Sequence, residues 1–157
     1  MYAYYIHACE IKGIAMMIVE HSVITKASRE ALWALYENSA TWPIWDDGIE
    51  SVSLHGPFVV GTKGTLKPAG GPEVVFEMVS VKRLHSFTDV SYLPLTKLIF
   101  THAVDEQPDG QLKVTHRVAM EGLLSPLFAF VIGRKIKAGL PLAMKKLVAL
   151  AESNPIV

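Results

Sequence analysis

The stretch that decides the fold is residues 97–121, with the sequence KLIFTHAVDEQPDGQLKVTHRVAME. Apolar and polar residues alternate on both sides of Pro108-Asp109-Gly110, as in two half-buried strands joined by a tight turn. With a three-residue loop there, His102 stands opposite His116. Both share one face, because side chains along a strand change sides at every residue. Their apolar neighbours on that face are Leu98, Phe100, Val104, Leu112, Val114, Val118 and Met120. The pattern predicts a hairpin with two histidines side by side on its inner face.

The pattern of short strands separated by turn residues continues toward the N-terminus. Extended segments are predicted at 49–55, 61–67, 73–82, 85–92, 97–105 and 111–121, with another strand beginning at Met17. Four of the five breaks between consecutive segments carry glycine or proline, namely Gly56-Pro57, Gly70-Gly71-Pro72, Leu93-Pro94 and Pro108-Asp109-Gly110. Short strands joined by tight turns form an antiparallel meander, not a parallel sheet with crossover helices.

Helical patterns flank the meander. Ser28 is a good N-cap for a helix that follows the first strand, and Thr41-Trp42-Pro43-Ile44-Trp45 allows a second short helix. Ser125-Pro126 opens a helix predicted to run to about Glu152, with serine as its cap. Gly139 and Pro141 interrupt the middle of this long helix, and Pro141 is expected to kink it so that it follows a concave sheet.

Composition limits the class of protein. The chain has 157 residues, enough for one domain, and 15 basic residues balance 15 acidic ones. This neutral balance argues against nucleic acid as a partner. Cys9 is the only cysteine, so no internal disulfide forms, and a cytoplasmic location is expected. The longest uncharged run from Gly13 ends at Val19, so neither a signal peptide nor stable membrane insertion is expected. Residues 1–16 are interpreted as an N-terminal extension, either loosely attached or an added edge strand, and 17–157 as a single domain.

The order of elements resembles the START-like superfamily, also called SRPBCC or Bet v 1-like. It is most similar to the bacterial polyketide cyclase/dehydrase and lipid-transport branch. The local sequences that carry the resemblance are Ile24-Thr-Lys-Ala27 before Leu32-Trp33, Trp42-Pro-Ile-Trp45, Gly61, Asp109-Gly-Gln-Leu-Lys-Val-Thr115 and the helix opening near Ser125. The resemblance implies an α+β helix-grip fold, in which a curved antiparallel sheet wraps around a long C-terminal helix, with two short helices between the first and second strands. It implies no shared catalytic motif.

Candidate ligand contacts follow from the predicted inner face and from aromatic residues near it. They are Trp42, Trp45, Phe76, Phe87, Tyr92, Phe100, His102, His116, Val118, Met120, Phe128 and Ile132. We expect an enclosed apolar cavity bounded by the helix at 128–136 and by the inner strand faces. The histidine pair, with Asp89 nearby if a small bulge permits, has three open interpretations: half-buried structural histidines, a polar anchor for a ligand oxygen, or an acid–base pair. The six histidines lack metal-ligand spacing, so no metal is expected, and no cofactor motif is found.

Three functions remain open from the sequence. The first is binding or carriage of a small hydrophobic molecule, such as a lipid, a polyketide or an aromatic metabolite. The second is a cyclase or dehydratase using His102 and His116, so whether the protein is an enzyme is left undecided. The third is an interaction module whose sheet edge, or basic segment at 134–137, meets a protein or membrane surface; a homodimer is compatible with the sequence.

Overall fold

The computed structural model describes residues 16–154. Within this range seven strands form one antiparallel sheet, in the spatial order β1-β7-β6-β5-β4-β3-β2. The strands are β1 Met16–Thr25, β2 Ile49–Leu54, β3 Lys63–Pro68, β4 Val74–Lys82, β5 Ser86–Leu93, β6 Thr96–Glu106 and β7 Leu112–Gly122. Strands β2 to β7 form the predicted meander, and β1 extends it by pairing with β7. The predicted bounds are correct to within two residues.

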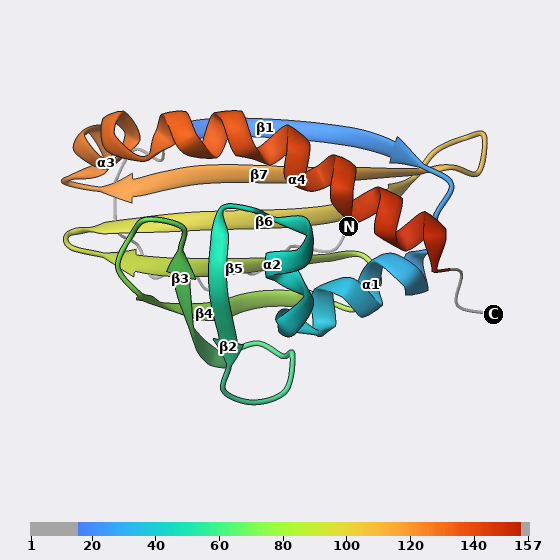
Figure 1. Ribbon diagram of the computed structural model, residues 1–157, viewed down its shortest axis with the longest axis horizontal. Helices are drawn as coiled ribbons and strands as arrows, with labels where there is room; N and C mark the ends of the chain where they lie inside the picture. Colours follow the sequence, from blue (N-terminus) through green and yellow to red (C-terminus); the bar gives the residue numbers. More distant parts are fainter. Residues whose placement is uncertain (1–15, 155–157) are drawn as a thin grey trace, which may run out of the picture.

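The helical elements are α1 Arg29–Glu37, the 3-10 turn η1 Ser39–Thr41, α2 Trp42–Trp45, α3 Ser125–Val131 and α4 Gly133–Ser153. Figure 1 shows α4 crossing the sheet on the side where α1 and α2 lie. The helix α4 contacts β1, α1 and α2, so it packs between the curved sheet and the two short helices. This is the α+β helix-grip arrangement, as predicted.

The start of α1 follows the sequence closely. The Ser28 hydroxyl accepts a hydrogen bond from the Ala31 backbone N–H at 3.1 Å, which confirms the predicted N-cap. The helix buries Leu32, Trp33 and Tyr36 against the sheet. It therefore delivers two large aromatic side chains to the centre of the molecule.

The C-terminal helix differs from the prediction in its cap and in its break. Leu124, not Ser125, is the N-cap, and the Ser125 hydroxyl donates to the Gly122 carbonyl. The predicted single helix is two helices, separated at Ile132, whereas Pro141 lies inside α4. Glycine at 133 has low helix propensity, and a break there lets α3 pack on β7 while α4 packs on β1. Proline is tolerated in α4 because residue 141 faces solvent.

The β6–β7 hairpin has the predicted register. Gln107 and Gln111 flank the turn, joined by a 2.8 Å hydrogen bond from the Gln107 N–H to the Gln111 carbonyl. His102 is paired directly with His116, so the predicted cross-strand pair is confirmed. Register at this hairpin fixes which side chains face the helix α4.

The predicted extension at 1–16 lies outside the described residues, apart from Met16 at the start of β1. No helix within residues 16–154 is long and apolar enough to cross a membrane.

Candidate functional site

An internal cavity of about 510 Å³ lies between α4 and the inner face of the sheet. Strands β3, β5 and β6 supply much of its wall, and the first half of α4 covers it. Its large apolar lining residues are Trp42, Trp45, Ile49, Leu66, Val74, Phe87, Leu93, Leu98, Phe100, Ile132, Ile136 and Leu140. This volume is in the range of small-molecule sites.

Seven of the twelve predicted contacts line this cavity. They are Trp42, Trp45, Phe87, Phe100, His102, His116 and Ile132. Three others, Phe76, Val118 and Met120, are fully buried and belong to the packed core. The predicted cavity boundary was wrong at these three positions. Their side chains point to the inner face of the sheet, but other side chains pack against them there and leave no open space.

Tyr92 and Phe128 also lie outside the cavity. Tyr92 is on the outer face of β5, since Phe87, Asp89 and Ser91 point inward and alternation sends residue 92 outward. Its hydroxyl lies 3.4 Å from a Glu77 carboxylate oxygen. Phe128 is on α3 and packs against the core.

The cavity is not fully enclosed, contrary to the prediction. Exposed residues at one end of the lining, Asp47, Gly48, Ala69 and Gly70, connect it with solvent. The β3–β4 turn and the end of α2 therefore form part of a mouth.

A buried polar cluster lies on the inner wall. The rings of His102 and His116 are 4.4 Å apart between centroids, and the Tyr36 hydroxyl is 2.8 Å from His116 Nε2. His102 also stacks on Phe87 with a centroid separation of 4.1 Å. Tyr36 could not be predicted as part of this site, because its position depends on how α1 packs on the sheet.

Asp89 is the third titratable side chain in the cluster. It pairs with Phe100 in regular β5–β6 register, so no bulge is needed to bring it inward. Its Oδ1 atom lies 3.8 Å from His102 Nδ1, beyond hydrogen-bond distance. Neither of these two atoms has a hydrogen-bond partner within the described residues.

Burial sets the charges of the cluster. It lowers the pKa of His102 to about 3, partly offset by a hydrogen bond with the Phe87 backbone. It also holds the pKa of His116 well below its usual value, and the neighbouring His102 and His21 act in the same direction. Burial raises the pKa of Asp89 to about 7. Near neutral pH both imidazoles are uncharged, so His102 and Asp89 do not form an ion pair.

Trp45 adds a donor to the same wall. Its indole N–H is buried and has no partner in the part of the chain that the structure describes, and its ring contacts His116 at a centroid distance of 6.2 Å. Unpaired buried polar atoms are uncommon in folded proteins, because each costs about 1–3 kcal/mol. Three of them, on Trp45, Asp89 and His102, belong to side chains that line one cavity. These three atoms are themselves covered, so a small rotation of the side chain is needed before a ligand hydroxyl or carboxyl group can satisfy them by accepting or donating hydrogen bonds.

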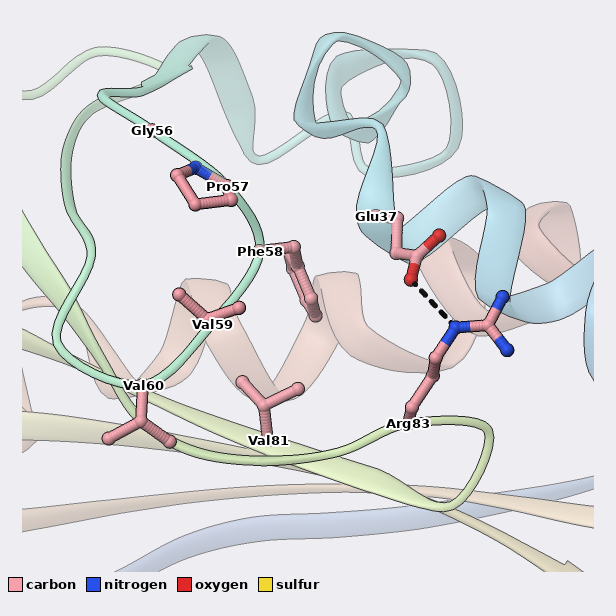
Figure 2. A pocket seen from close by; sticks show the side chains of 8 residues that line it. All are labelled: Glu37, Gly56, Pro57, Phe58, Val59, Val60, Val81 and Arg83. Atoms are coloured by element: carbon pink, nitrogen blue, oxygen red, sulfur yellow. Dashed lines mark ion pairs between the residues drawn. The ribbon is translucent and has the colours of Figure 1, made fainter.

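A second hollow is a surface groove of about 720 Å³ beside the β2–β3 loop. Figure 2 shows Val59, Val60 and Val81 along it, with the Glu37–Arg83 ion pair at the far side. Phe58 separates this groove from the cavity, since its ring contacts Phe87 at 5.0 Å. The groove lacks an unpaired buried polar atom among the described residues, so the internal cavity is the stronger candidate site.

Metal ligands are not grouped in the part of the chain that the structure describes. Residues 16–154 hold no cluster of three or more His, Cys, Asp or Glu side chains that could bind an ion.

Comparison with known structures gives the same architecture. Norcoclaurine synthase from Thalictrum flavum, in complex with dopamine and hydroxybenzaldehyde, is 16% identical with a TM-score of 0.68; the match covers 92% of this chain and 91% of that one. The di-domain ARO/CYC StfQ from the steffimycin biosynthetic pathway is 12% identical with a TM-score of 0.69, over 88% of this chain and 51% of that one. Ara h 8.0201 is 13% identical with a TM-score of 0.67, over 89% and 99%. These identities show a shared fold alone.

No curated protein sequence matches the chain significantly. A family model described as polyketide cyclase/dehydrase and lipid transport matches residues 16–152, which is nearly every residue that the structure describes. The resemblance noted from the sequence is thereby confirmed. The chain belongs to the polyketide cyclase/dehydrase and lipid-transport family.

Proposed function

We propose that the protein binds and carries a small hydrophobic molecule with one polar end. The observation that carries this proposal is an apolar cavity of about 510 Å³ lined by three side chains that each hold a buried polar atom without a partner in residues 16–154. Apolar lining gives affinity through burial, and a few polar groups fix orientation. The polar end of the ligand binds beside Trp45, Asp89 and His102, and its apolar body lies along β5, β6 and α4.

A matched pair of probes tests the polar anchor. Naphthalene and 2-naphthol have almost the same shape, but only the second carries a hydroxyl. We expect 2-naphthol to bind more tightly than its partition from water predicts, by roughly five- to tenfold, since a buried hydrogen bond contributes about 1 kcal/mol. His102→Phe should remove that advantage while naphthalene still binds. His85→Phe, at an exposed turn, is the matched control.

Isothermal titration of both probes against the three proteins gives the answer. Equal loss of both probes in His102→Phe would mean that the cavity had collapsed, and it would count against an anchoring role. Failure of wild-type protein to bind either probe would contradict the proposal itself. Mass spectrometry of the small molecule released from native protein on denaturation then identifies the natural ligand class.

A second candidate is a cyclase or dehydratase acting on a polyketide-like substrate. Asp89 favours it, because a carboxyl group with a pKa of about 7 in a cavity can exchange protons near neutral pH. The histidines are weaker candidates for the acid, since burial lowers the pKa of His102 to about 3 and its imidazole is therefore uncharged near neutral pH. In this version Asp89 transfers the proton, and His102 orients the substrate.

The bound molecule distinguishes carrier from enzyme. A carrier releases the same compound from wild-type protein and from Asp89→Asn. A dehydratase blocked at Asp89 releases a precursor heavier by one water than the compound found in wild type. Identical masses from the two proteins would rule against catalysis by Asp89.

A further inference from the structure

An exposed apolar stripe runs along α3. Leu127, Phe130 and Val131 follow the spacing of one helix face, and Leu123 lies in the turn just before the helix. Leu123 and Phe130 are 79% and 76% exposed. Large apolar side chains at this exposure are common singly, but a contiguous group of them usually marks an interaction site.

The β5–β6 turn extends the stripe. Leu95 is 68% exposed, with a positive φ of 52° that holds the turn tight. Thr96 pairs with Gly122, directly before Leu123, so the turn and the start of α3 are neighbours. Figure 1 shows α3 and this turn at the same end of the molecule.

The opposite face of α3 packs against the rest of the protein. Phe128, Ala129 and Ile132 pack against the core, so α3 is apolar around its whole circumference. A helix of that kind is normally buried on every side. The exposed half therefore needs a partner that is absent from the described residues.

Charge indicates what that partner is. The segment from Leu123 to Ala151 contains no acidic residue. Arg134, Lys135 and Lys137 follow the stripe directly, are exposed, and make no ion pair within residues 16–154. Apolar side chains next to unpaired cations are the make-up of an interfacial helix on an anionic bilayer.

We propose that α3 and the β5–β6 turn dock the protein on the surface of a membrane that contains anionic phospholipid. Phe130 and its apolar neighbours enter the headgroup region, and the three cations contact lipid phosphates. A second copy fits less well, because a two-fold dimer across this patch would bring two sets of unpaired cations together.

The docking surface is close to the cavity mouth. Ile132, Lys135 and Ile136 line the cavity, and the Lys135 ammonium group lies beside the Gly70 turn at the mouth. Docking would bring this rim near the lipid headgroups. The docking itself does not depend on what the cavity carries.

Vesicle flotation tests the proposal with the full chain. Vesicles of phosphatidylcholine alone are compared with vesicles of phosphatidylcholine mixed with phosphatidylglycerol. We expect binding to the mixed vesicles that weakens with added salt, since exposed charge attraction is screened. Phe130→Ser should weaken binding by roughly tenfold or more, through lost apolar burial. The double variant Arg134→Gln/Lys137→Gln should weaken binding to the mixed vesicles by roughly tenfold or more.

The matched control is Ile24→Ser, at a 49% exposed position near the end of β1, away from α3. It should bind as wild type does, and thermal melting confirms that each variant is folded. Absence of wild-type binding to both vesicles, or unchanged binding by Phe130→Ser, would overturn the proposal. A concentration-dependent dimer in light scattering that Phe130→Ser converts to monomer would assign the stripe to a second copy and would also overturn it. Probe binding in the cavity is measured separately, so the two proposals can fail independently.

Discussion

At the scale of single residues, Tyr36 organises the buried polar cluster. Its hydroxyl bonds to His116, and its ring contacts His102, Trp45 and Phe87. One side chain from α1 therefore joins the polar wall to the aromatic core. Burial raises the pKa of this phenol, so it stays protonated near neutral pH.

Tyr36→Phe is expected to destabilise the fold. It removes the hydroxyl that bonds His116 Nε2 and leaves a buried nitrogen without a partner, which costs about 1–3 kcal/mol. Urea unfolding measures the loss. Tyr92→Phe is the matched control, because its hydroxyl bonds Glu77 on the surface, and its change should be within about 0.5 kcal/mol. Equal effects at the two positions would contradict a structural role for the Tyr36 hydroxyl.

Asp89 should leave a signature in the pH dependence of stability. Its folded pKa of about 7 is above the ordinary 3.8, so the folded state keeps a proton that the unfolded chain loses, and stability falls as pH rises between these values. His102 acts in the opposite sense, since its lowered pKa makes stability rise with pH between about 3 and 6.5. The two contributions oppose each other in wild type over most of this range.

Asp89→Asn removes only the contribution of Asp89, which lowers the stability as the pH rises. The variant should gain stability relative to wild type as pH rises from 5 toward 7, by about 1.4 kcal/mol per pH unit. Urea unfolding at pH 5 and pH 8 measures the difference. Asp105→Asn, at an exposed position on β6, should differ from wild type equally at both pH values. A pH-independent effect of Asp89→Asn would mean that Asp89 is ionised in the folded state throughout.

The residues of the cluster differ in how far the sequence predicts them. Alternation and a three-residue turn bring His102 and His116 together, because hairpin register is a local property. Asp89 follows from the next strand by the same rule. Trp45 is expected from the sequence as an aromatic contact near the inner face, whereas the place of Tyr36 in the site depends on how α1 packs on the sheet, which no local pattern specifies.

At the scale of elements, the break between α3 and α4 separates two tasks. The helix α4 packs on the sheet and covers the cavity, whereas α3 leaves half of its apolar surface exposed. The sequence favours a kink at Pro141, because proline removes a helical hydrogen bond. At an exposed proline, water can bond to the carbonyl that lacks its helical partner, so α4 continues through Pro141. The helix breaks before Gly133 instead.

Two glycines in the C-terminal region, Gly122 before α3 and Gly139 inside α4, should respond oppositely to alanine. Gly122 has a φ of 129°, and a Cβ there would overlap the Leu95 carbonyl. Gly122→Ala should therefore cost more than about 2 kcal/mol of unfolding free energy. Gly139 lies inside α4 with nothing near its Cβ position, so Gly139→Ala should add about 0.5–1 kcal/mol. Thermal melting should show a lower melting temperature for Gly122→Ala and a higher one for Gly139→Ala than for wild type. Melting temperatures that shift in the same direction would contradict this account of the C-terminal region.

At the scale of the whole molecule, the meander could be predicted and the cavity only in part. Turn residues and alternation predict six consecutive strands, but the position of β1 beside β7 follows from no local pattern. The presence of a cavity follows from the helix-grip resemblance. Its boundary does not, because Phe76, Val118 and Met120 satisfy the inward pattern and still pack into a solid region.

The central claim is that the cavity under α4 binds a hydrophobic molecule by its polar end. A crystal structure of the protein with 6-bromo-2-naphthol tests it most directly, because anomalous scattering from bromine locates the probe independently of the rest of the map. The account predicts one bromine peak between α4 and strands β5 and β6. It also predicts the naphthol oxygen within about 3 Å of Trp45 Nε1, His102 Nδ1 or Asp89 Oδ1. A peak confined to the groove beside Phe58, or a cavity that stays empty at saturating probe, would contradict it.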